Sequence, residues 1–310
     1  MPAIICEPIV SQEQWHSLRA ENVGCSEVGA LFGCHEYVTG YGLAARKMGK
    51  LPDTIDDTVL RRGRYLEPVA KRLLEEEKPK WRQIAATSYY YDPKIHFGAT
   101  PDLFVEGEAG GLGIVQIKTV APQIFASKWH NSEGNIEPPL WIAMQAMGEQ
   151  HLTGADFAVI AALVVGYGIS LELIEVPYMP GVVNEMRERV QAFWKQVATG
   201  ELPEPDYGTD HAALQAVLRD DDGSEIDLTG DNEIPEIVSQ FEAARQSKKL
   251  ADTLMTECKD KLLHRIGPAQ TAKYSGGIIK AKTVLRSAYT VPAGSYRQVL
   301  VKPERAQAVR

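Results

Sequence analysis

Apolar residues recur every three or four positions along several stretches of the chain, a spacing that places them on one side of a helix. These stretches predict helices within 11–50 and over 59–78, 139–153, 182–200 and 232–266. In the first region Ser11 has the character of an N-cap, and Lys47-Met-Gly49 ends the second of its helices. The helix over 59–78 is the clearest, since its apolar side continues until Pro79.

The pattern changes between residues 83 and 120, where apolar positions alternate or form short runs rich in β-branched and aromatic residues. This pattern predicts strands over 86–92, 97–100, 103–105 and 113–119, with glycines at 107, 110 and 111 marking the last turn. Two further strands follow over 155–167 and 169–176. The order of helices, antiparallel meander, helix, strands and helix predicts an α/β (α+β) core, in which helices flank a central mixed sheet.

Beyond residue 200 the chain changes character. Pro203, Pro205 and the acidic run 220–222 predict a surface loop, and 280–300 predict terminal hairpin-like strands. Apolar residues of the helix over 232–266 fall near a heptad seam that Lys248 interrupts. With so few clean heptads, we favour packing on the core or in an antiparallel helix pair over an intermolecular coiled coil. We therefore expect a core over 1–200 and a C-terminal extension over 201–310 packed on it.

Composition narrows the class of protein. A chain of 310 residues with 44% hydrophobic and 24% charged residues is typical of a soluble globular protein. No apolar run approaches the roughly 20 residues of a membrane span, and 1–6 lack the features of a secretory signal, so we expect a cytoplasmic protein. The four scattered cysteines form no Cys-x-x-Cys pair and the histidines have no metal-like spacing, which disfavours a zinc or iron-sulfur site. A net charge of −8 restricts any nucleic-acid contact to a local groove.

Three polar residues on neighbouring predicted strands are candidates for catalysis. Asp102 lies where one predicted strand begins, and Gln116 and Lys118 are two positions apart on the next, so they share a face. Phosphodiester cleavage needs a metal beside the phosphate and a positioned water, and oxygen atoms are the ligands that Mg²⁺ prefers. Lys118 could lie beside that water or the scissile phosphate, while residue 116 supplies an oxygen.

Thr100-Pro-Asp102 with Gln116-Ile-Lys118 resembles the PD-(D/E)xK nuclease signature. The flanking sequence, over about 15–200, resembles the phage-type exonuclease branch that includes YqaJ-like viral recombinases and lambda exonuclease. Glu67 lies in a segment similar to the family's helix whose Glu adds a metal ligand, and Gln145 in one similar to its Gln-bearing helix. Arg19 and Ser26 resemble its 5′-phosphate-binding segment, and the tail over 296–302 is also similar.

The resemblance implies a restriction-endonuclease-like fold and a 5′–3′ exonuclease on linear double-stranded DNA. It would use Mg²⁺, which Mn²⁺ can replace, and leave 3′ overhangs for a single-strand annealing protein in homologous recombination. Glu67, Asp102, Gln116 and the Ile117 carbonyl would hold metal, Lys118 would orient water, and Gln145 would support Lys118 or the phosphate. The family often forms rings around DNA, which implies a homo-oligomer, a trimer by resemblance. A phage or prophage would encode the protein, which would act in the bacterial cytoplasm.

Each of these residues also has an ordinary structural interpretation. Asp102 could be a turn residue, Lys118 an exposed strand residue and Gln145 a polar helix residue. Glu67 lies among apolar positions of its helix, so it would need a partner such as Arg61 or Arg64. Arg19 and Ser26 could be a surface arginine and an N-cap.

Gln116 departs from the signature, which normally has a carboxylate there. The family could tolerate Gln with activity kept, the residue could be an engineered replacement that traps a complex, or the domain could have lost catalysis and kept DNA binding. Loss of one negative charge beside a divalent cation weakens metal binding. A catalytically silent DNA-end binding protein and a structure-specific endonuclease therefore remain as alternatives.

Overall fold

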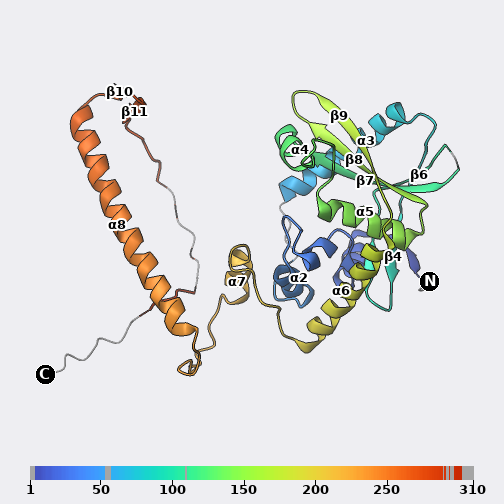
Figure 1. The fold of residues 1–310 in the computed structure, drawn as a ribbon, viewed down its shortest axis with the longest axis horizontal. Coiled ribbons are helices and arrows are strands. Elements are labelled where there is room, and N and C mark those ends of the chain that lie inside the picture. Colours follow the sequence, from blue (N-terminus) through green and yellow to red (C-terminus); the bar gives the residue numbers. More distant parts are fainter. Residues whose placement is uncertain are drawn as a thin grey trace. The chain divides into compact units, whose positions relative to one another are not determined.

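The computed structural model describes residues 4–52, 57–108, 110–288, 290, 293 and 297–301 (Figure 1). The chain divides into two compact units, Met1–Val217 and Leu218–Arg310. This division falls after Val217, whereas the sequence predicted a border at residue 200. That predicted border, and the packing of the extension on the core, stay predictions.

The first unit is built on a mixed five-stranded sheet with the order β3-β6-β7-β8-β9. Its strands are β3 (Arg82–Ala85), β6 (Leu103–Glu106), β7 (Leu112–Val120), β8 (Phe157–Val165) and β9 (Ile169–Val176). β7 and β8 are parallel and the other neighbours are antiparallel. The predicted central mixed sheet flanked by helices is therefore confirmed, although β3 was not predicted.

Alternate residues of the central strands bury opposite faces of this sheet. Val115, Val159 and Ala161 pack with Leu74 of α3 (Asp57–Glu77). Ile114, Ile160 and Ala162 belong to the larger cluster that includes α5 (Leu140–Thr153) and α6 (Pro180–Thr199). Burial on both faces explains why β8 is a continuous apolar run instead of an alternating one. Gln116 and Lys118 share the parity of Ile114, so they lie on the side of the sheet that α5 covers.

A second, four-stranded sheet has the order β1-β4-β5-β2. It contains β1 (Ile5–Pro8), β4 (Ser88–Asp92), β5 (Phe97–Ala99) and β2 (Val23–Gly24). β4 and β5 were predicted, but the structure separates them from β6 and β7, so the predicted single meander belongs to two sheets. β1 and β2 lie in regions where no strand was predicted.

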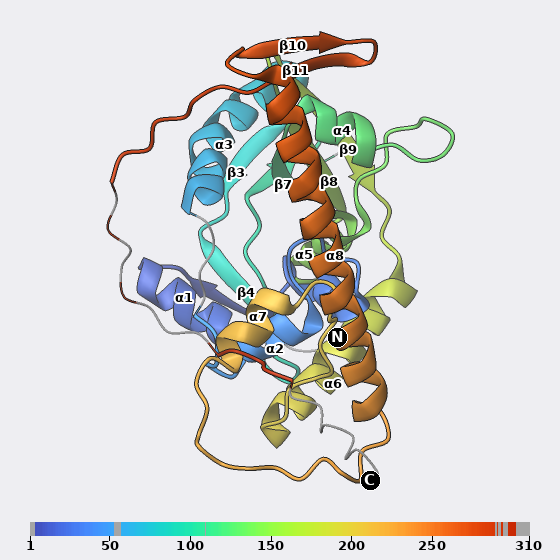
Figure 2. The same ribbon diagram turned by 90° about the vertical axis from the view of Figure 1, so that its left-hand side faces the viewer.

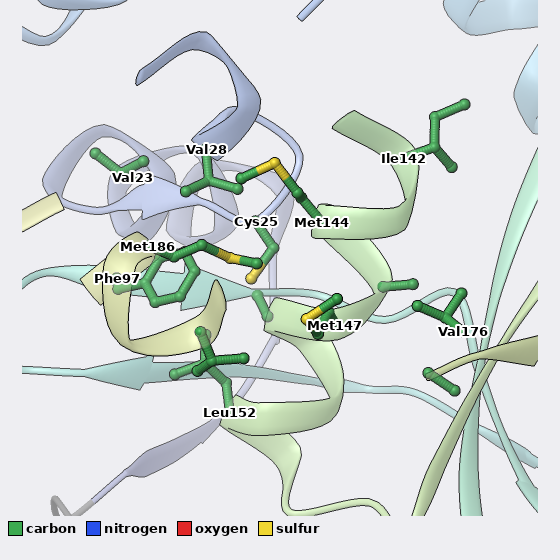
Figure 3. Packing of buried hydrophobic residues seen from close by; sticks show 14 of the residues in the cluster. Val23, Cys25, Val28, Phe97, Ile142, Met144, Met147, Leu152, Val176 and Met186 are labelled. Carbon is green, nitrogen blue, oxygen red and sulfur yellow. The ribbon is translucent and has the colours of Figure 1, made fainter. Parts of the chain in front are cut away.

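α5 packs closely against this second sheet. A Cβ atom at Gly148 would lie 2.8 Å from Cys25 Sγ and 3.2 Å from Phe97 Cζ, so only a hydrogen fits. Figure 3 shows Cys25 beside Met144 and Met147 of α5, and Phe97 belongs to the same buried cluster. α5 therefore contacts both sheets of the first unit.

The region predicted as helical over 11–50 contains α1 (Gln12–Glu21), a 3₁₀ helix η1 (Val28–Phe32) and α2 (Gly40–Lys47). Ser11 caps α1 as expected, since its hydroxyl accepts a hydrogen bond from the Gln14 N–H at 3.1 Å. Gly49 follows α2 with a φ of +69°, a conformation that glycine adopts readily. The short helices α4 (Pro122–Lys128) and α7 (His211–Val217) were not predicted.

The second unit contains α8 (Ile234–Ile266) and a hairpin of β10 (Thr271–Tyr274) and β11 (Gly277–Lys280) (Figure 2). The prediction of terminal strands over 280–300 is wrong for the residues described there, because the hairpin ends at Lys280. In the family-like tail, Tyr296 and Lys302 lie outside the described residues. Among the helices that the structure describes, none is long and apolar enough to cross a membrane.

Candidate active site

A cleft of about 1000 Å³ opens in the first unit, lined by residues of both sheets together with α1, α3 and α5. Every residue that the sequence nominated for a role lines it: Arg19, Ser26, Glu67, Asp102, Gln116, Ile117, Lys118 and Gln145. Positions far apart along the chain therefore converge on one cavity.

One part of the cleft, here called the Lys118 end, consists of Asp102, Gln116, Lys118, Gln145 and Glu149. Asp102 precedes β6, and because Leu103 pairs with Val115, it lies beside Gln116 on the neighbouring strand. Asp102 Oδ2 accepts hydrogen bonds from Gln116 Nε2 at 2.5 Å and from the Ile117 backbone N–H at 2.8 Å. Asp102 is thus fixed to the strand that carries the lysine.

Lys118 is held by α5. Its ammonium donates to Gln145 Oε1 at 2.8 Å and lies 5.4 Å from the centre of the Trp141 ring. Gln145 Nε2 in turn donates to Glu149 Oε1 at 2.8 Å. Both ends of the Gln145 amide are therefore engaged, which fixes its orientation and presents its oxygen to Lys118.

Sequence reasoning missed Glu149, a carboxylate only 1% exposed. Its Oε2 atom is buried and has no hydrogen-bond partner among the described residues. Burial, and then the nearby Asp102 charge, raise the pKa of Glu149 to about 8. The sequence could have indicated Glu149, because it follows Gln145 by four positions and residues four apart share a helix face.

Burial also acts on the other titratable groups at this end. It raises the pKa of Asp102 to about 6, although Lys118 and the Ile117 N–H oppose the change. Burial lowers the pKa of Lys118, while Asp102 and Glu149 oppose that change. The positive charge at this end is therefore too small to offset the effect of burial on the pKa of the two carboxyl groups.

Glu67 reaches the cleft from α3. Its carboxylate pairs with Lys71, one turn later in the same helix, with 2.6 Å between Oε1 and Nζ. Lys71 also lines the cleft. Glu67 therefore presents a partly exposed carboxylate to the cleft, and this carboxylate is already paired with Lys71.

A second part of the cleft, here called the Arg19 end, is lined by Arg19, Ser26 and Tyr89, and Glu27 and Lys47 lie next to these residues. The Arg19 guanidinium lies 4.8 Å from the centre of the ring of Trp15, whose indole N–H donates to Thr100 Oγ1 at 3.1 Å. Sequence reasoning did not nominate Trp15, although it precedes Arg19 by one turn of α1. The ring fixes the position of the arginine at the edge of the cavity.

Two buried charges support the segment that carries Arg19 and Ser26. Lys47 Nζ donates to the carbonyls of Arg19 and Asn22, at 2.7 and 2.8 Å, and lies 3.0 Å from Glu27 Oε2. Burial alone would raise the pKa of Glu27, but the charges of Lys47 and Arg19 outweigh it and hold the pKa below its usual value. This end therefore has more positive charge than Glu27 neutralises.

The oxygen atoms near Asp102 match the ligands of a hard divalent cation. No group of three His, Cys, Asp or Glu side chains within the described residues could hold a metal by itself. Gln116 Oε1, however, is buried and has no partner among those residues, and Asp102, Glu67 and Ile117 line the same cleft. Two carboxylates, an amide oxygen and a backbone carbonyl suit Mg²⁺ with water and phosphate completing its shell.

Residues 14–156 match the family model of the YqaJ-like viral recombinase domain. The resemblance to YqaJ-like viral recombinases that the sequence indicated is therefore confirmed for this part of the chain. The matched residues include both ends of the cleft, from Trp15 to Glu149. The search of the curated proteins found no match.

Solved structures with a similar fold include an alkaline exonuclease, LHK-Exo, from Laribacter hongkongensis. It is 18% identical, with a TM-score of 0.48, over 61% of this chain and 94% of that chain. A phage related exonuclease from Haemophilus somnus 129PT is 13% identical, with a TM-score of 0.42, over 58% and 96% of the two chains. A SOX–DNA complex is 12% identical, with a TM-score of 0.40, over 60% and 67%.

Proposed function

We propose that the protein is a metal-dependent exonuclease that degrades the 5′ strand of linear double-stranded DNA. The arrangement that carries this proposal is Lys118, held by Gln145, beside Asp102 and the unpartnered oxygen of Gln116. A cation at one end of the cleft and an anion-binding group at the other suit a DNA strand that enters by its terminus.

At the Lys118 end, Asp102, Gln116 Oε1 and the Ile117 carbonyl would hold Mg²⁺, or Mn²⁺ in its place, with Glu67 of α3 as a further ligand. The ion would supply charge to the scissile phosphate and lower the pKa of a bound water. Lys118 would orient the attacking water or a phosphate oxygen, since Gln145 keeps its ammonium in one position. Gln145 is therefore a positioning residue for Lys118.

At the Arg19 end, Arg19 and Ser26 would receive the terminal 5′-phosphate. A phosphate monoester carries more negative charge than an internal phosphodiester, so the excess positive charge favours a strand terminus over a continuous strand. This preference would give the 5′–3′ direction and leave 3′ single strands. Such strands suit a single-strand annealing protein in phage-type recombination, which we propose as the partner.

The charge of the whole chain fits a contact confined to the cleft. Net charge is −8, yet Arg19, Arg62, Arg64 and Lys71 all line this cavity. We further propose, from the family resemblance, a homo-oligomer that forms a trimeric ring around DNA in the cytoplasm of a bacterial host. Enclosure would keep an acidic protein on DNA without a wide basic surface.

The deciding experiment measures nucleotide release from linear duplex with Mg²⁺. We expect release by the protein, abolition by EDTA, and a loss of at least about a hundredfold in Lys118→Ala. Lys195→Ala, at an exposed position of α6, is the matched control and should keep full activity. Release from closed circular DNA at the same rate would overturn the exonuclease assignment and favour an endonuclease.

A catalytically silent DNA-end binding protein is the second candidate, favoured by the missing carboxylate at Gln116. It predicts a gel shift of linear duplex that persists in EDTA. It also predicts no nucleotide release with either Mg²⁺ or Mn²⁺. Release with either metal excludes it.

A further inference from the structure

Tyr89 has an unexplained hydroxyl group inside the cleft. The residue lies on β4, is 1% exposed, and lines the cavity. Its hydroxyl oxygen is buried and has no hydrogen-bond partner among the described residues. A buried hydroxyl without a partner costs free energy in the ligand-free protein, so a partner supplied by a ligand would remove that cost.

Two glycines bring this hydroxyl together with the Arg19 end. A Cβ atom at Gly98 would lie 2.1 Å from Tyr89 Oη, and Gly98 pairs with Gly24 in the parallel strands β5 and β2. A Cβ at Gly24 would lie 3.3 Å from Ser26 Oγ and 3.9 Å from Arg19 Nη1. Paired residues of neighbouring strands point to the same face, so the glycines form one floor beneath all three polar groups.

The groups above this floor suit an anion with several oxygens. Arg19 supplies a charged donor, and Ser26 and Tyr89 supply hydroxyl donors. Glu27 is also close, with Oε2 3.5 Å from the same Gly24 Cβ position, but this oxygen already accepts from Lys47 and from the Gly24 N–H. Burial raises the pKa of Tyr89, so its hydroxyl stays protonated and able to donate.

We propose that the Tyr89 hydroxyl is the third donor to a terminal 5′-phosphate, together with Arg19 and Ser26, and that it contributes to selecting phosphorylated over unphosphorylated strand ends. The absence of side chains at Gly24 and Gly98 leaves room for the phosphate oxygens and for the hydroxyl. This inference rests on the proposed exonuclease function and adds a specificity-determining residue to it.

The test compares Tyr89→Phe with the unchanged protein on linear duplex carrying either a 5′-phosphate or a 5′-hydroxyl. We expect the preference for 5′-phosphate to fall about tenfold to a hundredfold, as for the loss of one hydrogen bond to a charged group. The rate on 5′-hydroxyl ends should change less than about twofold. Tyr91→Phe, two positions along β4 and outside the cleft lining, should keep the preference.

Thermal unfolding shows whether Tyr89→Phe is folded, and we expect a melting temperature no lower than that of the unchanged protein. A full 5′-phosphate preference in folded Tyr89→Phe overturns the inference and leaves the exonuclease function standing. If the unchanged protein releases no nucleotide at all, the proposed function fails. Binding of 5′-phosphorylated duplex in EDTA then decides the inference: weaker binding by Tyr89→Phe supports it, and equal binding overturns it.

Discussion

The two ends of the cleft have opposite electrostatic balance. At the Lys118 end, burial raises the pKa of both Asp102 and Glu149, although Lys118 opposes the change at both groups and Lys71 opposes it at Asp102. At the Arg19 end, Lys47 and Arg19 together lower the pKa of Glu27 despite its burial. One cavity can therefore favour a cation at one end and an anion at the other. The two ends of the cleft thus differ in electrostatic character before any DNA is bound.

The strongest test of this contrast is Asp102→Asn. Removal of this charge should reduce metal-dependent nucleotide release about a thousandfold, or ~4 kcal/mol of barrier, because the Lys118 end would no longer attract a cation. Stability to urea in EDTA should not fall, since an amide oxygen can still accept from Gln116 and Ile117 without burying a charge. Loss of stability without loss of activity would mean that Asp102 is a structural residue only.

Glu149→Gln tests the same end through its pH dependence. The folded-state pKa of about 8 exceeds the ordinary 4.5, so the folded protein holds a proton that the unfolded chain releases. The resulting stabilisation is complete below about pH 4.5 and is lost as pH rises through about 8.

Relative to Glu149→Gln, the unchanged protein should therefore lose a few kcal/mol of unfolding free energy over this range, with a slope of at most ~1.4 kcal/mol per pH unit. Urea unfolding in EDTA at several pH values measures it. Glu175→Gln, at an exposed position of β9, is the matched control for the loss of one carboxylate. Parallel pH profiles for Glu149→Gln and the unchanged protein would contradict the expected burial effect.

Gln116→Glu sharpens the contrast by making the Lys118 end more negative. Metal affinity should rise about tenfold, or ~1.4 kcal/mol, because a charged oxygen replaces an amide oxygen beside the ion. Calorimetric titration with Mn²⁺ measures the affinity. Increased nucleotide release would show that the present chain is impaired, whereas unchanged affinity would show that residue 116 does not contact the metal.

Ser26→Ala should have the smallest effect and should act only at the Arg19 end. Loss of one neutral hydroxyl should reduce the preference for 5′-phosphate about threefold, or ~0.6 kcal/mol, with the rate on 5′-hydroxyl ends unchanged. Ser170→Ala, at an exposed position of β9, is the matched control. An equal loss on both kinds of end would assign Ser26 to chemistry or folding instead of end recognition.

Elements with a long, regular pattern could be predicted from the sequence. α3, α5, α6 and α8 each have enough turns for helical spacing to emerge, and β8 is long enough for its apolar run to be recognised. β1, β2 and β3 are short, and they exist because β4, β5 and β6 pair with them. Local sequence contains no information on such distant pairing, nor on which strands belong to which sheet.

The sequence could predict those residues of the candidate site that belong to a motif with a recognisable order along the chain. Asp102, Lys118 and Gln145 lie on the expected elements and converge in one cleft. Lys47 and Tyr89 could not be identified because their roles depend on neighbours from other elements. Glu149 could have been identified, since it follows Gln145 by one turn of α5. The terminal hairpin was misplaced because apolar residues continue after Lys280, although the strands pair around the turn that precedes Gly277.

The close packing at Gly148 has a consequence for the products. α5 holds Lys118 through Gln145 and, three residues later, touches Cys25 beside the floor of the Arg19 end. A helix has a fixed rise of about 1.5 Å per residue and resists stretching, so the separation of the two ends is constant. On the proposed function, that separation determines which bond behind a captured strand terminus reaches Lys118, and thus how many nucleotides each fragment contains.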